Sequence, residues 1–164
     1  MKSYTIYTGS DFGMLKCAAY DGENVVLRTV MANETSAPVE IETANICLKS
    51  EYDAEQTLIP GVTKRTVYYK GLDLEFATIR WNRDETYTID FKDELIIAAH
   101  SDPRSYTFTM DGVQVASISR PADKTPLREG GVTYDPAYKV EYEEGLSQQA
   151  LIMILVFPVL YFGF

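Results

Sequence analysis

The last 19 residues of this chain constrain its fold more than any other segment. The run from Leu146 to Phe164 has no charged side chain and contains thirteen large apolar or aromatic ones. Full burial of each is worth roughly 1.5–3 kcal/mol, so leaving the set in water costs on the order of 20–40 kcal/mol. That exceeds the roughly 5–15 kcal/mol net stability of a typical domain. The segment must therefore be enclosed by protein or lie in lipid.

We expect this segment to form a helix that is apolar on every face. Every side chain from Ala150 to Phe157 is apolar, which leaves no polar face at helical spacing. Ser147 is a suitable N-cap residue, and Glu143 and Glu144 precede it where the helix dipole favours acids. Pro158 predicts that the helix ends or kinks near Phe157.

A tail inserted in lipid is the rival interpretation of the same segment. A spanning helix needs about 20 apolar residues, but Gln148 and Gln149 open this run and Pro158 interrupts it. The flank before it is acidic and no Lys or Arg follows it, unlike the basic flanks of many membrane segments. These features favour a helix buried in protein, and insertion in lipid stays open as the alternative.

The first 142 residues predict short strands joined by turns. They are rich in Thr, Tyr, Val and Ile, alternate with period two, and are punctuated by Gly or Asp. Asp21-Gly22 and Asp111-Gly112 are hairpin turn signals. The regions 32–38 and 121–136 are expected to be loops. The expected strands are 3–8, 14–20, 24–30, 39–48, 65–70, 72–81, 86–91, 94–100, 106–110, 113–119 and 137–142, with a weaker one at 57–62.

Regular spacing of short strands is typical of a sandwich or a meandering barrel. A barrel of about 12 strands is wide enough to admit one helix, and closing it removes exposed strand edges. We therefore predict a mainly β, single domain over residues 1–164. Residues 1–142 would form a closed antiparallel barrel, and a central helix would occupy about 147–160.

A strand motif, an alternating strand and an apolar helix follow one another in the last third of the chain. Together they resemble the tubby C-terminal-like superfamily, which includes tubby proteins, phospholipid scramblases and LURP-one-related proteins. In the last group a G-x-x-V-A-x-I strand precedes an alternating strand and an apolar helix. The resemblance implies the same barrel around a central helix. The three segments are Asp111-Gly112-Val113-Gln114-Val115-Ala116-Ser117-Ile118, Tyr138-Lys139-Val140-Glu141-Tyr142 and Leu151 to Leu160.

The resemblance also implies a candidate lipid contact. Tubby proteins bind phosphoinositides through basic residues on the barrel surface. In this chain Lys64 and Arg65 form the compact basic pair, with Lys70 and Arg80 on neighbouring expected strands. We take Lys64 and Arg65 as the candidate contact for a lipid headgroup. The competing interpretation is that they form a solvated hairpin end.

Catalytic, metal and cofactor chemistry have little support in the sequence. His100 is the only histidine available to a Ser/His/Asp or Cys/His site, and it follows an apolar strand just before a turn. Scramblases carry an acidic calcium-binding segment before their helix, but the acids here lack the spacing of a calcium loop. Gly130-Gly131 lacks the Lys-Ser/Thr of a phosphate loop. We predict no enzyme, no catalytic residues, no cofactor and no metal.

The net charge of −9 disfavours nucleic acid and a strongly anionic membrane as partners. The N-terminal residues lack the apolar core of a signal peptide, so we expect a cytoplasmic protein with Cys17 and Cys47 reduced. A peripheral location at a membrane stays open. The expected function is a monomeric, non-enzymatic binding or scaffold module for a protein or phospholipid ligand. The alternative is a membrane-associated protein whose C-terminal helix inserts in lipid, as a scramblase-like or tail-anchored protein.

Overall fold

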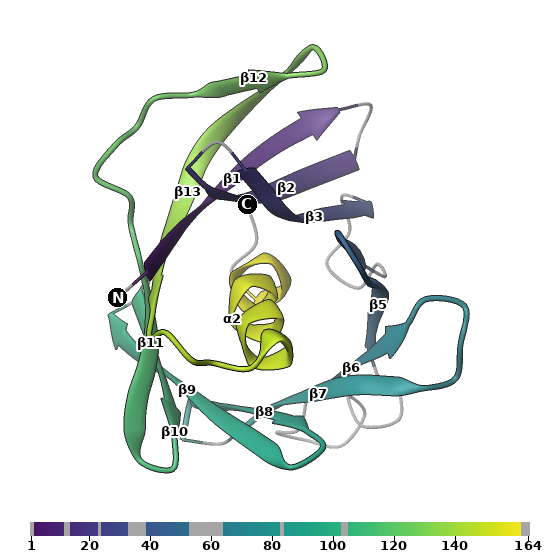
Figure 1. Cartoon of the computed structure of the whole chain (residues 1–164), viewed down its shortest axis with the longest axis vertical. Coiled ribbons are helices and arrows are strands. Elements are labelled where there is room, and N and C mark those ends of the chain that lie inside the picture. Colours follow the sequence, from purple (N-terminus) through teal and green to yellow (C-terminus); the bar gives the residue numbers. More distant parts are fainter. Residues whose placement is uncertain are drawn as a thin grey trace.

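The chain folds into a closed β-barrel with a helix inside it (Figure 1). The computed structural model describes residues 2–11, 14–22, 24–32, 39–52, 64–82, 84–102 and 105–161. Within these ranges thirteen strands form one antiparallel sheet in the order β1 to β11, then β13 and β12, and β1 also pairs with β13. Twelve strands thus close the ring, which confirms the predicted barrel.

The strands follow one another around the ring in chain order, each next to its predecessor until β12. They are β1 (Lys2–Asp11), β2 (Met14–Asp21), β3 (Asn24–Ala32), β4 (Val39–Thr43), β5 (Cys47–Tyr52), β6 (Lys64–Tyr69), β7 (Glu75–Trp81), β8 (Tyr87–Phe91), β9 (Glu94–Asp102), β10 (Ser105–Met110), β11 (Val113–Ser119), β12 (Leu127–Glu129) and β13 (Val132–Tyr142). Both hairpins expected from an Asp-Gly pair are present, at β2–β3 and β10–β11. The weaker strand expected at 57–62, and positions 33–38 of the first expected loop, lie outside the described residues.

The helix α2 (Gln148–Tyr161) occupies the centre of the ring (Figure 1). Every side chain from Ile152 to Leu160 is buried. These side chains form one apolar core with inward residues of the strands, such as Ile79 and Phe108. The prediction that the apolar segment is enclosed by its own barrel is therefore confirmed.

The start of α2 is fixed by Ser147, as predicted. Its hydroxyl accepts a hydrogen bond from the Ala150 amide at 3.1 Å and donates one to the Glu94 carboxylate at 2.7 Å. The helix does not end near Phe157, because α2 continues through Pro158 to Tyr161, in agreement with the predicted span of about 147–160. Proline inside a helix costs about 3 kcal/mol, whereas burying Val159 and Leu160 returns roughly 1.5–3 kcal/mol each.

The expected strand 39–48 is in fact a hairpin of β4 and β5. Thr43 makes the turn, because its amide donates to the Ile46 carbonyl at 2.9 Å and its hydroxyl accepts from the Ile46 amide at 3.1 Å. Side-chain bonding of this kind lets threonine stabilise a turn inside an alternating pattern. The inward positions are odd-numbered up to Ile41 and even-numbered from Leu48 onward, so the alternation changes phase at this turn.

The expected loop at 121–136 also contains sheet structure. β12 and the first part of β13 form a hairpin across Gly130-Gly131, both of which have positive φ, as a tight two-residue turn requires. Pro136 is accommodated because the β1–β13 register shifts next to it, and bulges are where a sheet tolerates proline. The hairpin stands at the edge of the barrel in Figure 1.

We call residues 127–134 the outer clasp, because they pack on the outside of β1 to β3. The Glu129 carboxylate accepts hydrogen bonds from the Tyr20 hydroxyl and the Arg28 guanidinium. Gly9 permits the approach, since a Cβ there would lie only 2.9 Å from the Thr133 carbonyl oxygen. The bonds from Tyr20 and Arg28 hold the pKa of the Glu129 carboxyl below its usual value.

We expect Glu129→Gln to lower stability at neutral pH, with the difference from the parent protein disappearing in acid. A carboxyl whose pKa is lowered by folding stabilises above its ordinary pKa and loses that contribution as the pH falls through the folded value. Urea midpoints measured from neutral to acid pH test this. Glu144→Gln, at an exposed position, is the control, and a pH-independent gap for Glu129→Gln would contradict the account.

Phe157→Ala should destabilise the protein by about 3–5 kcal/mol. Phe157 is fully buried, and its ring centroid lies 5.1 Å from those of Tyr87 and Tyr106 and 5.4 Å from that of Phe108. Chemical denaturation measures the change. Leu72→Ala, on a side chain that is 60% exposed, should shift stability by less than about 0.5 kcal/mol. Similar effects of the two variants would argue against a helix-centred core.

Candidate functional site

Lys64 and Arg65 do not form a surface pair. Neighbouring residues of a strand point to opposite faces, and Arg65 lies opposite buried Ile79 on the inner face of the barrel. Its side chain is 1% exposed, and Nη1 donates to the Ser50 hydroxyl at 3.1 Å. Lys64 is half-buried on the outer face, opposite exposed Arg80. The expectation that Arg65 lies at a solvated hairpin end or meets a headgroup is therefore corrected.

His100 is exposed at the end of β9 and contacts Tyr106 on β10. Its Nε2 lies 2.6 Å from the Tyr106 hydroxyl, and the two ring centroids are 4.0 Å apart. Burial, and then the neighbouring Tyr87 and Tyr138, raise the pKa of Tyr106. A hydroxyl with a raised pKa is less available as an acid or nucleophile at neutral pH. Within the described ranges no three His, Cys, Asp or Glu residues are grouped to hold a metal ion.

One end of the barrel is bordered by short turns. Because the strands alternate in direction, the turns after β2, β4, β6, β8 and β10 share an end with the link from β13 to α2. The first residues of α2 lie at this end. We call it the hairpin rim. It comprises the described residues of 21–26, 43–46, 70–75, 92–95, 111–114 and 143–149.

Large apolar side chains are exposed at the hairpin rim. Every large hydrophobic residue that is exposed in the described part of the chain lies there, within or directly after a turn. They stand on four turns around the ring, and their confinement to one end of the barrel distinguishes that end from the rest of the described surface. The side chains are Val25 at 37% exposure, Leu72 at 60%, Leu74 at 57%, Leu95 at 47% and Val113 at 65%.

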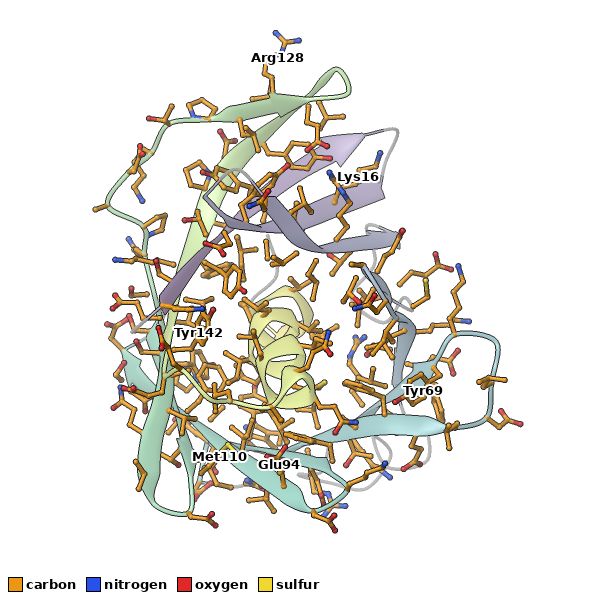
Figure 2. The ribbon with its side chains drawn as sticks, in the orientation of Figure 1. Lys16, Tyr69, Glu94, Met110, Arg128 and Tyr142 are labelled. Carbon is orange, nitrogen blue, oxygen red and sulfur yellow. The ribbon has the colours of Figure 1, made fainter. Side chains whose placement is uncertain are left out.

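Two hollows open beside the start of α2. The β3 cleft, of about 260 Å³, is lined by Tyr4, Val25, Val26, Leu151 and Leu155 among others. The β7 cleft, of about 410 Å³, has Tyr69, Leu74, Phe76 and Gln149 in its wall. Each is therefore walled partly by a rim residue and partly by α2. Figure 2 shows Tyr69 on the opposite side of α2 from Tyr142, whose ring stacks on that of Tyr4 with centroids 5.1 Å apart.

The hairpin rim is acidic as well as apolar. Carboxylates dominate its exposed charged groups, and the lysines are fewer. Burial raises the pKa of Tyr142, a hydrogen bond with Tyr4 adds to this, and the negative charges of Asp21 and Glu144 raise it further. Asp21 directly follows Tyr20, which pairs with Thr5, and Glu144 follows the end of β13, so both acids lie at the same end as the Tyr4–Tyr142 pair. The exposed acids are Asp21, Asp73, Glu75, Asp93, Asp111, Glu143 and Glu144, and the lysines at this end are Lys2, Lys70 and Lys92.

Comparisons with known proteins add no functional assignment. No model of a protein family, no curated protein and no solved structure matches this chain.

In the described part of the chain no helix meets the length and hydropathy that a bilayer crossing requires, α2 having 14 residues. The hairpin rim was not predicted from the sequence, although a signal was present: each exposed apolar residue follows a turn signal such as Asp21-Gly22 or Asp111-Gly112 by one to three positions.

Arg65→Glu should abolish cooperative unfolding or lower stability severely, whereas Lys64→Glu should leave the fold intact. The first change places a carboxylate beside Ser50 on the inner face, and an uncompensated buried ion costs several kcal/mol. The second changes a half-buried side chain on the outer face. Circular dichroism and urea denaturation of both variants provide the test. If both variants unfolded cooperatively with similar urea midpoints, Arg65 would have to be exposed to solvent.

Proposed function

We propose that this protein is a non-enzymatic binding module that takes a protein partner on its hairpin rim. The observation that carries the proposal is the gathering of Val25, Leu72, Leu74, Leu95 and Val113 at one end of the barrel. Apolar surface exposed to water is unfavourable, and a partner that covers it contributes roughly 25 cal/mol of binding free energy per Å² of apolar surface.

The shape of the hairpin rim supports this role. Its described turns are short and continue directly into paired strands, so the exposed side chains are held by a closed sheet. A surface held in place before binding loses less conformational entropy when a partner arrives. The two clefts provide recesses in which partner side chains can be desolvated, as the central residues of interfaces are.

The charge of the hairpin rim supports a protein partner over an anionic lipid surface. Its carboxylates would repel phospholipid headgroups of the same sign. On the outer face of the barrel, Lys64 and Arg80 are the basic side chains that face each other across β6 and β7. Lys64 and Arg80 are therefore the candidate contacts for a phospholipid headgroup, in place of the predicted pair Lys64 and Arg65. Arg65 is not included in it, because it is buried on the inner face.

A cytoplasmic location is part of the proposal. Cys17 and Cys47 are free thiols, and Cys47 is exposed, a state that persists in a reducing compartment. Burial raises the pKa of the Cys17 thiol to about 12, so this side chain acts as a core residue at neutral pH.

Leu74→Glu combined with Val113→Glu should weaken partner binding at least about tenfold. Both side chains are more than half exposed, so the fold should be retained, as unchanged urea midpoints would show. The parent protein and the variant are used to capture partners from an extract of the source cells. Each captured protein is then purified and its affinity for both forms is measured by calorimetry.

Ser101→Glu is the matched control, because Ser101 is exposed on β9 at the opposite end of the barrel. It should bind the purified partner as the parent protein does. A partner that binds the double variant and the parent protein equally would place the binding face elsewhere. Binding to anionic vesicles that is lost in Lys64→Glu/Arg80→Glu, with no protein partner, would favour the phospholipid alternative.

A further inference from the structure

We infer that the partner segment which the hairpin rim takes is a basic amphipathic helix with two apolar anchors, one for the β3 cleft and one for the β7 cleft. This inference rests on the proposed function and specifies the chemistry of the partner. It follows from three properties of the rim: the apolar surface in each cleft, which dominates the β3 cleft and makes up about half of the β7 cleft, the separation of the clefts, and the acids around them.

The lining of the β3 cleft fits an apolar side chain. Val25, Val26, Leu151 and Leu155 supply aliphatic surface, and Tyr4 adds an aromatic ring. Val25 and Leu151 are partly exposed, so an entering side chain would cover surface that water now contacts. At about 260 Å³ the cleft has the size of one or two large side chains rather than of a drug-sized ligand.

The β7 cleft provides a second binding site for an apolar side chain, on another side of α2. Leu74 and Phe76 contribute apolar surface, while Glu75 and Asp90 place carboxylates at its edge beside Lys92. Four strand spacings of about 4.8 Å separate β3 from β7 around the ring. The clefts therefore lie roughly 15–20 Å apart, a span that a helix covers in about 11 residues at 1.5 Å each.

The negative charge of the rim favours a partner segment of positive charge. Asp21 ends β2 opposite Asn24, the neighbour of Val25 in the β3 cleft. Glu144 lies two residues after Tyr142, whose ring stacks on Tyr4 of the same cleft. Glu143, Asp73 and the acids at the other turns continue the negative field around the rim. Lysine or arginine residues flanking each anchor would therefore be favoured, and an acidic segment of the same shape would be repelled. A strongly anionic bilayer is disfavoured for the same reason.

Three synthetic helical peptides test the inference by fluorescence anisotropy. The first has a lysine-rich polar face and two leucine anchors about 11 residues apart. The second replaces its lysines with glutamates, and the third replaces one anchor with serine. We expect the first to bind, the third to bind at least about tenfold more weakly, and the second not to bind. Affinity for the first should fall as salt is added.

Matched variants of the protein locate the charge effect. Asp21→Asn with Glu144→Gln should weaken the first peptide about fivefold to tenfold. Glu85→Gln with Asp135→Asn removes the same charge from exposed positions at the opposite end, and should leave the affinity unchanged. Equal effects of the two pairs would show that net charge alone attracts the peptide, which would overturn the inference.

The remaining outcomes are also decisive. Failure of the first peptide to bind, or equal binding of the first and third, would overturn the two-anchor helix. If captured partners depend on Leu74 and Val113 while the basic peptide binds no better than the acidic one, the proposed function stands and this inference falls. Phosphatidylserine vesicles that bind through the rim and compete with the first peptide would assign the face to a membrane instead.

Discussion

The enclosure of α2 by the sheet is the interaction on which the rest of this structure depends. Neither the helix nor the sheet can be stable alone, because the helix is apolar on every face and the inner faces of the strands are apolar too. Each covers what the other must hide from water. The sheet is assembled from neighbours along the chain, but its closure pairs β1 with β13, and α2 follows β13 in sequence. The core is therefore completed only when α2 enters the barrel after β13 has paired.

Polar contacts at the start of α2 set its position within this apolar core. Ser147 caps the helix and at the same time donates to Glu94 at the beginning of β9. A helix without a polar face has no pattern that fixes its rotation or depth, since every face is equally apolar. The hydrogen bond from Ser147 provides a directional constraint that dispersion and burial do not. The ring contacts of Phe157 with Tyr87, Tyr106 and Phe108 add a second one near the other end.

The parts of the fold that the sequence predicts are those set by local chemistry. Asp-Gly turns, the Ser147 cap and the all-apolar helix each depend on a few adjacent residues. The β4–β5 turn was missed because Thr43 makes it through a side-chain bond and no Gly or Pro marks it, although the inward positions change phase between Ile41 and Leu48. The outer clasp was missed because Pro136 and the glycines at 130 and 131 are typical of loops as well as of bulged hairpins. Its closure depends on Glu129 reaching Tyr20 and Arg28, residues about a hundred positions away.

The candidate site was predictable only in part, for a different reason. Lys64 and Arg65 are adjacent in sequence, and strand geometry alone requires them to lie on opposite faces, so the alternation could have separated them. The hairpin rim is a property of topology, since Val25 and Val113 lie at the same end of the barrel only because the strands alternate in direction around a ring. Turn signals place each residue at a turn, but no local pattern says which turns share an end.

A barrel filled by its own helix also restricts where a partner can bind. In barrels of comparable width without such a helix, the interior can hold a ligand. Here Ile152 to Leu160 occupy that space, and two hollows lie where α2 begins, beside Gln148 and Gln149. The proposed partner would therefore bind at the end of the barrel, where the exposed Val25 and Leu74 side chains border the two clefts. The same helix that stabilises the fold thus supplies one wall of each cleft.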